Sequence, residues 1–353
     1  MPRLAYTDDL SAEELERFDV IIDVRSPSEF AEDHLPGAVN LPVLDDEERA
    51  RVGTHYTRVS AFEARRMGAA LVSRNIAHHL ETALADKPKD FKPLIYCWRG
   101  GMRSQSMGLV LASVGWKVTL IEGGYRTWRR QVVAALETGT APRVVLIDGQ
   151  TGTGKTALLH ALAAEGEQVI DLEGLAHHRG SIFGDFAGMP QPGQKAFETA
   201  LHDRLRRMDP SRPVFVEAES RQVGHRRVPP RLWDAMQAAP RITITVPVDE
   251  RARYLVEAYP DLLADAGKLD AAFEGLKPFH AKARIAEWRA LAQAGDWHAL
   301  ARALITEHYD PAYNRARKRQ EAGSGLVRME IDQLDEADLT AAATRIIAIA
   351  KAL

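Results

Sequence analysis

The sequence predicts an α/β protein with two domains, the second of which ends in a helical part. With 353 residues, the chain is longer than one hydrophobic core usually organises. Short apolar runs alternate with helical patterns, as expected for parallel sheets covered by helices on both faces. Two of these runs lead into glycine-rich turns, at residues 97–101 and 149–154. Together these observations favour two separate α/β units.

The first predicted domain covers residues 1–137 and contains a helical insertion at about residues 45–90. Its first strand is the apolar run FDVIIDV at residues 18–24. Further strands are predicted at residues 39–41, 94–96 and 117–121, and a helix at residues 104–114. The periodic pattern lapses at residues 137–143 (ETGTAPR), so we place the domain boundary there.

The second predicted domain covers residues 143–353 and begins with a new buried strand, VVLID, at residues 144–148. That strand leads into a glycine-rich loop and a helix at residues 155–164. Additional strands are predicted at residues 168–171, 213–217 and 241–246. From about Asp249 the pattern is mostly helical, with a basic break at residues 309–320. This domain therefore combines an α/β unit with a helical and basic C-terminal region.

Composition narrows the class of protein. Hydrophobic residues make up 45% and charged residues 27% of the chain, which is ordinary for a folded globular protein. The 46 basic and 49 acidic residues give a net charge of −3, so a nucleic-acid partner needs local basic patches. A single cysteine excludes an internal disulfide and a cysteine-cluster zinc site. No apolar stretch reaches about 18 residues and residues 1–10 lack a secretory pattern, so we expect a cytoplasmic protein without a membrane span.

The glycine-rich loop after residues 144–148 fits the phosphate-binding pattern G-x-x-x-x-G-K-[ST] at every fixed position. Its residues are Gly149, Gln150, Thr151, Gly152, Thr153, Gly154, Lys155 and Thr156. Glycines let the backbone bend so that its N–H groups point at phosphate oxygens, and Lys155 supplies a positive charge. The Thr156 hydroxyl is placed to hold Mg²⁺ if a metal is used. Glu217 and Glu219, at a strand end, are possible metal ligands, although acidic residues also occur there for structural reasons.

The single cysteine, Cys97, lies in the segment CWRGGMRS between a buried strand and a helix. Such a turn points backbone N–H groups at the sulfur and places it at a helix N-terminus, and both effects favour the thiolate nucleophile. Arg99 and Arg103 add positive charge and hydrogen-bond donors for a bound anion. A lone cysteine is often only a small buried hydrophobic residue, but the flanking glycines and arginines favour a catalytic role.

Together with Asp23-Val24-Arg25 and the segment HLPGA at residues 34–38, this loop resembles the rhodanese domain. The resemblance implies a cysteine that carries sulfur or selenium as a covalent persulfide or its selenium analogue. Five residues separate Cys97 from Arg103, one more than in common sulfurtransferases and the same as in phosphatases built on the rhodanese fold. The wider loop suits phosphate or a phosphorylated chalcogen donor, and the loop by itself leaves both open.

A rhodanese-like domain joined to a P-loop domain resembles the tRNA 2-selenouridine synthase family over essentially the whole chain. The segments FEARRMGAALVSRNIA (62–77), LEGLAHHRGSIFG (172–184) and ESRQVG (219–224) carry this resemblance. It implies a transferase that moves a geranyl group from geranyl diphosphate to the sulfur of wobble 2-thiouridine in tRNA. Selenium from selenophosphate then replaces the geranylthio group, through Cys97. At Ala218 the family pattern has an acidic residue that this chain lacks.

The resemblance also implies a P-loop that holds a prenyl diphosphate, with Mg²⁺ possible and no tightly bound cofactor. Arg179 is expected to contact the diphosphate as well. The geranyl chain needs an apolar pocket near the P-loop. Candidate walls are Phe183, Phe186, Phe197 and Trp233, with core packing as the plainer interpretation of each.

Clusters of basic residues are the candidate tRNA contacts. The densest cluster comprises Arg315, Arg317, Lys318 and Arg319, with Tyr313 beside it. A second one comprises Arg226, Arg227 and Arg231, and a third Arg204, Arg206 and Arg207. Tyrosines can stack on an unpaired anticodon base while arginines contact phosphates. Each cluster is equally compatible with an ordinary solvated face.

Two other classes of protein remain open. The first is a P-loop kinase or ATPase fused to a rhodanese-type sulfurtransferase or phosphatase, which turnover of ATP rather than geranyl diphosphate would reveal. The second is a non-catalytic binding protein, which the presence of Cys97 in an activating loop disfavours. The sequence predicts neither the oligomeric state nor which tRNAs are selected.

Overall fold

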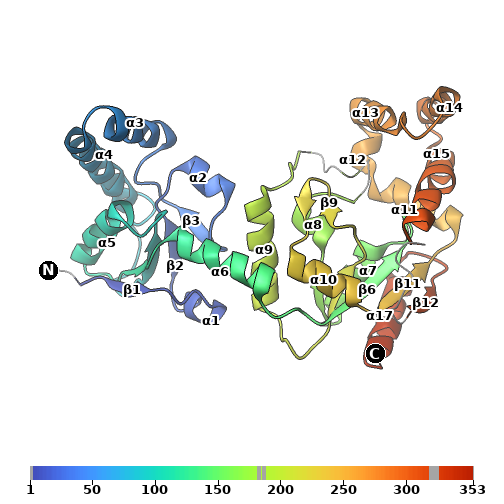
Figure 1. The fold of residues 1–353 in the computed structure, drawn as a ribbon, viewed down its shortest axis with the longest axis horizontal. Coiled ribbons are helices and arrows are strands. Elements are labelled where there is room, and N and C mark those ends of the chain that lie inside the picture. The colour runs from blue at the N-terminus through green and yellow to red at the C-terminus, as the bar shows by residue number, and fades with distance from the viewer. Residues whose placement is uncertain (1–2, 181–183, 185–187, 318–325, 353) are drawn as a thin grey trace. The chain divides into compact units, whose positions relative to one another are not determined.

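The computed structural model describes residues 3–180, 184, 188–317 and 326–352 (Figure 1). The chain divides into two compact units, of which unit 1 contains Met1–Thr138 and Gly193–Arg207. Unit 2 contains Gly139–Pro192 and Met208–Leu353. Residues 193–207 lie beyond the boundary that the sequence suggested, yet they pack with unit 1. No helix among the described residues is both long and apolar enough to cross a bilayer.

Unit 1 is built on a five-stranded parallel sheet with the strand order β1-β5-β4-β2-β3. The strands are β1 (Ala5–Thr7), β2 (Val20–Asp23), β3 (Ala38–Asn40), β4 (Pro93–Tyr96) and β5 (Thr119–Ile121). All four strands predicted for this domain are confirmed. Sequence reasoning missed β1, because two of its three residues are exposed and it has no apolar run.

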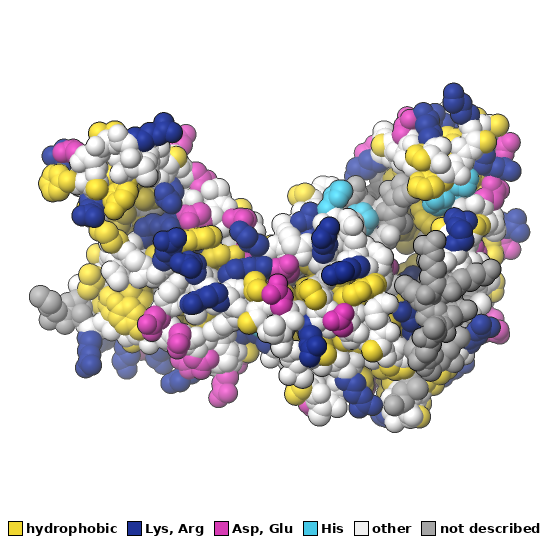
Figure 2. All heavy atoms as spheres, viewed as in Figure 1, with side chains coloured by type: hydrophobic (Ala, Val, Ile, Leu, Met, Phe, Trp, Pro, Cys, Tyr) yellow, Lys and Arg dark blue, Asp and Glu magenta, His cyan; other side chains and the backbone are white. Residues whose placement is uncertain are grey.

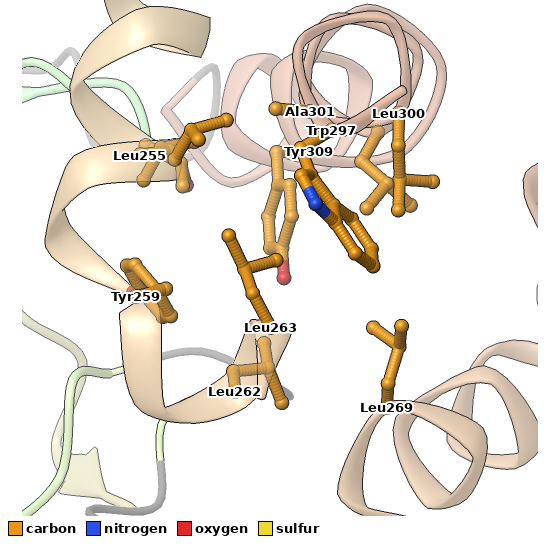
Figure 3. Close-up of a pocket in the computed structure, with 12 residues that line it drawn as sticks. Leu255, Tyr259, Leu262, Leu263, Leu269, Trp297, Leu300, Ala301 and Tyr309 are labelled. Atoms are coloured by element: carbon orange, nitrogen blue, oxygen red, sulfur yellow. The ribbon is translucent and has the colours of Figure 1, made fainter. Parts of the chain in front are cut away.

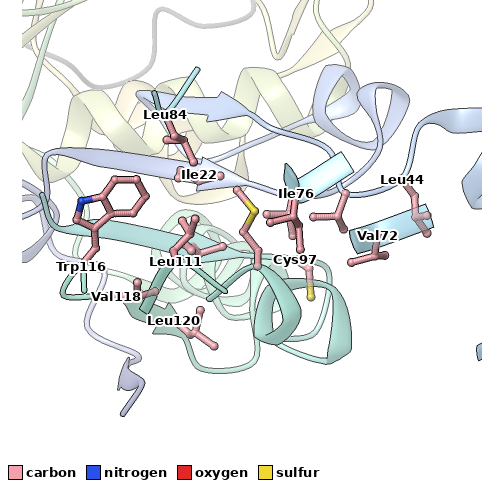
Figure 4. Packing of buried hydrophobic residues seen from close by; sticks show 14 of the residues in the cluster. Ile22, Leu44, Val72, Ile76, Leu84, Cys97, Leu111, Trp116, Val118 and Leu120 are labelled. Atoms are coloured by element: carbon pink, nitrogen blue, oxygen red, sulfur yellow. The ribbon is translucent and has the colours of Figure 1, made fainter. Parts of the chain in front are cut away.

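The helices of unit 1 follow the predicted α/β pattern. They are α1 (Ala12–Leu15), α2 (Pro27–Glu32), α3 (Asp46–Arg58), α4 (Ala61–Glu81), α5 (Met102–Val114), α6 (Tyr125–Thr138) and α9 (Gln194–Arg206). The insertion forms the pair α3 and α4, which begin at the N-cap residues Asp45 and Ser60. Residues of α4 and α5 pack against Ile22, Ile95 and Leu120 of the sheet in one hydrophobic cluster (Figure 4).

Unit 2 has a second five-stranded parallel sheet, with the order β12-β11-β6-β8-β7. Its strands are β6 (Val144–Gly149), β7 (Gln168–Ile170), β8 (Val214–Glu217), β11 (Arg241–Thr245) and β12 (Leu326–Glu330). The short strands β9 (Gln222–Val223) and β10 (Arg226–Arg227) form an antiparallel hairpin. Sequence reasoning missed β12, which joins the edge of the sheet from a region that was expected to be helical.

The remaining elements of unit 2 are helices. They are α7 (Lys155–Ala164), α8 (Leu172–Ala176), α10 (Pro230–Ala238), α11 (Val248–Ala258), α12 (Pro260–Leu263), α13 (Ala266–Leu276), α14 (Lys282–Gln293), α15 (Trp297–Leu304), the π-helical turn η1 (Ile305–Tyr309), α16 (Asp310–Arg317) and α17 (Glu336–Ala350). Helices α7 and α17 pack on the sheet, whereas α13, α14 and α15 share a separate apolar cluster. The chain is helical from η1 through α16, which ends at Arg317. The predicted basic break at residues 309–320 is therefore wrong for its described part.

Candidate functional site

The P-loop lies at the end of β6, the central strand of the unit 2 sheet. Gly152 and Gly154 have φ angles of 81° and 71°, which residues with a side chain rarely adopt. A Cβ atom at Gly152 would lie 3.0 Å from Leu255 Cγ on α11. The loop therefore needs glycine both for its turn and for its close approach to a helix.

Lys155 is the first residue of α7, and its Nζ donates a hydrogen bond to the carbonyl oxygen of Gly149 at 3.0 Å. The side chain thus folds back over the loop, as expected of a lysine that faces a phosphate group. The hydroxyl of Thr156 donates to Glu173 Oε2 at 3.1 Å. The predicted loop residues are therefore brought together with a carboxylate that sequence reasoning did not select.

A buried arginine stabilises the P-loop through hydrogen bonds. Arg251 on α11 is only 1% exposed, and its Nε donates to the Thr151 carbonyl at 2.8 Å. Its terminal nitrogens donate to Gln150 Oε1 at 3.1 Å and to both carboxylate oxygens of Asp310, at 2.6 and 3.0 Å. The Arg251–Asp310 pair holds α16 against the loop, which explains why the helix continues where the sequence suggested a break.

Three carboxylates gather beside Thr156. Glu217 ends β8 and accepts a hydrogen bond from the backbone N–H of Glu173 at 2.7 Å, while its other oxygen is buried without a partner in the described part of the chain. Burial, and then the nearby Glu173 carboxylate, raise the pKa of Glu219 to about 8. Burial also raises the pKa of Glu173 and that of Glu217. Such a like-charge cluster is stabilised by protons or by a cation.

Glu173 could have been found from the sequence. It follows β7, and β7 is the parallel neighbour of β8, which is in turn the neighbour of β6. The carboxyl ends of these three strands meet at one edge of the sheet, so acidic residues that follow them approach the P-loop. The two carboxylates predicted as metal ligands differ in position. Glu219 lines the P-loop cavity together with Glu173, whereas Glu217 does not line it and accepts a hydrogen bond from the backbone of Glu173.

The P-loop opens into a cavity of about 490 Å³. Its lining comprises the P-loop from Thr151 to Thr156, with His160, Asp171, Glu173, Gly174, Arg179, Gly180, Glu219, Tyr254, Leu255, Ala258 and Tyr259. Arg179 is one of these lining residues, with its guanidinium 4.5 Å from the centre of the Tyr259 ring. Within the described residues, no group of three His, Cys, Asp or Glu is arranged to hold a metal by itself.

An apolar cavity adjoins the P-loop cavity (Figure 3). It is lined by Thr151, Leu255, Val256, Tyr259, Leu262, Leu263, Leu269, Trp297, Leu300, Ala301, Leu304 and Tyr309. Thr151, Leu255 and Tyr259 line both cavities. Of the candidate walls, Phe197 is buried in unit 1 and Trp233 lies on α10, so neither lines this cavity. Phe183 and Phe186 lie outside the described residues.

Cys97 follows β4, the central strand of the unit 1 sheet. It belongs to the hydrophobic cluster of Figure 4 and is only 3% exposed, yet it lines a cavity of about 420 Å³. Ser104 Oγ donates to its sulfur at 3.2 Å. A Cβ atom at Gly124 would overlap the Cys97 carbonyl oxygen, so this glycine lets the next loop pack directly on the cysteine loop.

The two predicted arginines of this loop differ in their surroundings. Arg99 is exposed and lines the cavity. Arg103 also lines it, but its two terminal nitrogens donate to both oxygens of Glu29, at 2.6 and 3.2 Å. Burial alone would raise the pKa of Glu29, and the hydrogen bonds and charge of Arg103 outweigh it, so this pKa is lowered. Arg49 of α3, another lining residue that sequence reasoning missed, lies 3.9 Å from Glu29.

Asp23 and Arg25, which carried part of the rhodanese resemblance, have a structural position. Both are buried, and Arg25 donates two hydrogen bonds to Asp23 Oδ2, at 2.6 and 2.9 Å. Arg25 also donates to the carbonyl oxygen of Asp33 at 2.7 Å. Neither residue lines the Cys97 cavity, so this pair ties β2 to the loop before β3.

The candidate tRNA contacts do not gather in one unit, because Arg204, Arg206 and Arg207 belong to unit 1 and the other two clusters to unit 2. Arg226 and Arg227 form β10, and Arg315 is exposed on α16. Tyr313 is partly buried, with its hydroxyl 3.0 Å from Asp148 Oδ1 on β6, which makes it a contact of the P-loop strand. The side chain of Arg317 and all of Lys318 and Arg319 lie outside the described residues. On the face drawn in Figure 2, basic side chains are interspersed with acidic ones on both units.

Comparison with known proteins agrees with the two units. Residues 7–131 match the rhodanese-like domain family, and residues 142–286 match the family described as the tRNA 2-selenouridine synthase AAA domain. A crystal structure of the N-terminal domain of an ATP/GTP-binding protein from Clostridium difficile 630 is 34% identical and covers 37% of this chain and 98% of its own. Its TM-score of 0.31 is too low to describe a shared fold by itself.

Individual relatives give the stronger comparison. A tRNA 2-selenouridine synthase from Nitrosomonas europaea is 38% identical over 244 residues, which are 68% of this chain but only 63% of the relative. One from Cupriavidus necator is 36% identical over 336 residues, which are 86% of this chain and 89% of the relative. Because this second match extends over nearly all of both proteins, the chain belongs to the tRNA 2-selenouridine synthase family.

Proposed function

We propose that this protein is a transferase that converts wobble 2-thiouridine of tRNA into 2-selenouridine through an S-geranylated intermediate. The observation that carries the proposal is the pair of adjoining cavities in unit 2, one lined by the P-loop and one almost entirely apolar. A prenyl diphosphate has the same two parts, an anionic head and a hydrocarbon tail. The anionic head matches the P-loop cavity in chemistry, and the hydrocarbon tail matches the apolar cavity that adjoins it.

The diphosphate head binds at the P-loop in this proposal. Backbone N–H groups at the start of α7 and the charge of Lys155 neutralise its oxygens. Thr156, Glu173 and Glu219 would supply oxygen ligands of the kind that Mg²⁺ prefers. Mg²⁺ would stabilise the charge of the departing pyrophosphate. Arg179 adds a further positive charge on the lining of the same cavity.

Geranyl transfer forms a bond between the uridine sulfur and C1 of the geranyl group while the bond from C1 to the diphosphate oxygen breaks. The apolar cavity holds the tail in a dry setting lined by leucines, Tyr259 and Trp297. Exclusion of water around C1 protects the allylic centre from hydrolysis. The apolar lining that binds the tail therefore also favours transfer of the geranyl group to sulfur over its transfer to water.

The second step belongs to the Cys97 loop of unit 1. Selenophosphate is an anion, and the cavity around Cys97 is lined by Arg49, Arg99 and Arg103. We propose that selenophosphate binds beside Cys97, which positions its selenium. The selenium forms a bond to C2 of the uridine while the bond from C2 to the geranylthio sulfur breaks, geranylthiol leaves, and water cleaves the P–Se bond to release phosphate. Glu29 holds Arg103 in its observed orientation, so the loop is organised before selenophosphate binds.

The decisive experiment incubates the full chain with 2-thiouridine tRNA, geranyl diphosphate and selenophosphate, and identifies the nucleosides by mass spectrometry. We expect S-geranyl-2-thiouridine with geranyl diphosphate alone and 2-selenouridine when selenophosphate is added. A parallel assay measures ATP hydrolysis. If ATP is turned over while no geranylated nucleoside forms, the P-loop serves a kinase or ATPase and the proposal is wrong.

A further inference from the structure

Unit 2 contains a third cavity, which shares lining residues with the apolar cavity. The P-loop cavity and the apolar cavity share Thr151, Leu255 and Tyr259. The apolar cavity shares Leu263, Leu269 and Trp297 with the third, which measures about 340 Å³. The two shared sets have no residue in common, so the apolar cavity lies between the P-loop cavity and the third cavity.

The wall between the apolar cavity and the third cavity is made of side chains from three separate helices. Leu263 ends α12, Leu269 is buried on α13, and Trp297 begins α15. Figure 3 shows Leu255 and Tyr259 on one side of the apolar cavity and Trp297 with Leu269 on the other. An isoprenoid chain that enters from the P-loop side therefore meets the indole ring of Trp297 at its far end.

The space beyond this wall is different in character. The third cavity is also lined by Asp270, Arg289 and Gln293, and Arg289 pairs with Asp270 at 2.8 Å. The apolar cavity, with a volume of about 70 Å³, is much the smaller of the two. A chain longer than this small space would have to displace Trp297 and enter a partly polar cavity. Both requirements disfavour a longer chain.

We propose that Trp297, supported by Leu269, closes the prenyl pocket and sets the length of the isoprenoid that the enzyme accepts. This inference rests on the proposed geranyl transfer. In this proposal Trp297 lets the enzyme accept geranyl diphosphate and exclude farnesyl diphosphate, which is one isoprene unit longer. Removing the indole ring would join the apolar cavity to the third cavity and give the farnesyl chain room.

The test compares the full-length protein with its Trp297→Ala variant in a competition between equal concentrations of geranyl and farnesyl diphosphate. The readout is the ratio of S-farnesyl to S-geranyl 2-thiouridine in tRNA, measured by mass spectrometry. We expect the ratio of kcat/KM for farnesyl over geranyl diphosphate to rise at least tenfold. Trp297→Phe, which keeps an aromatic ring at the wall, should retain most of the original selectivity.

Two further variants keep the test decisive. Leu269→Ala opens the same wall from another helix, and it should raise the ratio in the same direction even if Trp297→Ala fails to fold. Trp233→Ala is the matched control, because Trp233 lies on α10 and lines neither cavity. An unchanged ratio in folded, active Trp297→Ala and Leu269→Ala proteins would overturn the inference. Absence of geranylation in the unmodified protein would instead overturn the proposed function.

Discussion

Cys97 and Lys155 occupy equivalent places in their two units. Each follows the central strand of a five-stranded parallel sheet and stands where the chain turns into a helix. Backbone N–H groups at such turns point outward, so both places suit anions. The side chains differ, since one is a thiol and the other a cation. Single substitutions should therefore separate the two proposed steps.

Replacing Cys97 with alanine is expected to abolish selenium incorporation and to leave geranylation largely intact. Only the selenium step needs a chalcogen-handling group, whereas prenyl transfer needs the diphosphate site. Nucleosides from treated tRNA, analysed by mass spectrometry, give both activities in one measurement. A folded Cys97→Ala protein that binds tRNA but has lost both activities would contradict this division of labour.

Lys155→Ala should lower the rate of geranylation by on the order of a hundredfold or more, because the lysine stabilises the departing pyrophosphate. Selenation of tRNA that already carries the geranyl group should be much less affected. The exposed Lys351 near the end of α17 provides a control, since Lys351→Ala removes the same charge far along the chain from the P-loop. Equal loss in both assays would mean that the P-loop also binds selenophosphate.

The carboxylate cluster makes the stability of the ligand-free protein depend on pH. Burial and Glu173 raise the folded-state pKa of Glu219 to about 8, well above that of an exposed glutamate. A raised folded pKa means that the folded state holds a proton that the unfolded state has already released. The stabilisation is full in mild acid below the unfolded pKa and is lost as pH rises toward 8.

We therefore expect the free energy of unfolding of the full chain to fall between pH 5 and pH 8, by at most about 1.4 kcal/mol per pH unit for each proton. Urea unfolding at a series of pH values measures this slope. Glu219→Gln, which cannot ionise, should flatten it, whereas Glu81→Gln at an exposed position of α4 should not. An identical slope in the Glu219→Gln protein would refute the assignment.

At the scale of elements, α9 shows how one helix can belong to a unit that is distant in sequence. Phe197, Thr199 and Leu201 of α9 are buried, and the helix packs against α6. Asp33 accepts hydrogen bonds from the Tyr125 hydroxyl at 2.6 Å and from Thr199 Oγ1 at 2.9 Å. The chain therefore leaves unit 2, completes the core of unit 1 with one helix, and returns.

Thr199→Val tests the contribution of that helix to unit 1. The substitution keeps the shape of the side chain but removes a donor to the buried Asp33, so we expect a loss of about 1–3 kcal/mol in the free energy of unfolding. Urea denaturation gives the value. Thr340→Val on the exposed face of α17, where the hydroxyl bonds only to the preceding turn, should change stability by less than about 0.5 kcal/mol. Similar small effects in both variants would argue against the Asp33 contact.

At the scale of the whole molecule, a net charge of −3 must be reconciled with a polyanionic substrate. Attraction to tRNA then depends on local basic clusters, and residues 315–319 hold the densest one in the sequence. Arg315 is exposed on α16, and α16 is tied to the P-loop through Asp310 and Arg251. We propose that this cluster guides tRNA toward the geranylation site.

Replacing Arg315, Arg317, Lys318 and Arg319 together with alanine should weaken tRNA binding and flatten its salt dependence. Each lost phosphate contact should reduce the slope of log affinity against log salt by roughly 0.7–0.9. Affinity for geranyl diphosphate, measured without RNA, serves as the control and should hardly change. An unaltered salt slope would assign the cluster to an ordinary solvated surface, and the group at Arg226, Arg227 and Arg231 would be tested next.

Much of the architecture could be predicted from the sequence because its signals are local. The run VVLID, the glycine-rich loop and the helix that begins at Lys155 occupy one continuous segment, so strand, phosphate loop and helix were all placed correctly. The same holds for β4, the Cys97 loop and α5. In each case apolar residues, glycines and charged residues within about 20 positions determine the local structure.

How distant segments complete these sites depends on the packing of the folded chain. Arg251 contacts the P-loop 100 positions away at Thr151, and Glu29 holds Arg103 across 74 positions. The apolar cavity is assembled from helices between Leu255 and Tyr309, whereas the aromatic residues proposed from the sequence and described in the structure lie elsewhere. Such contacts leave no periodic trace in the chain, because which residues meet is determined by packing and not by their spacing.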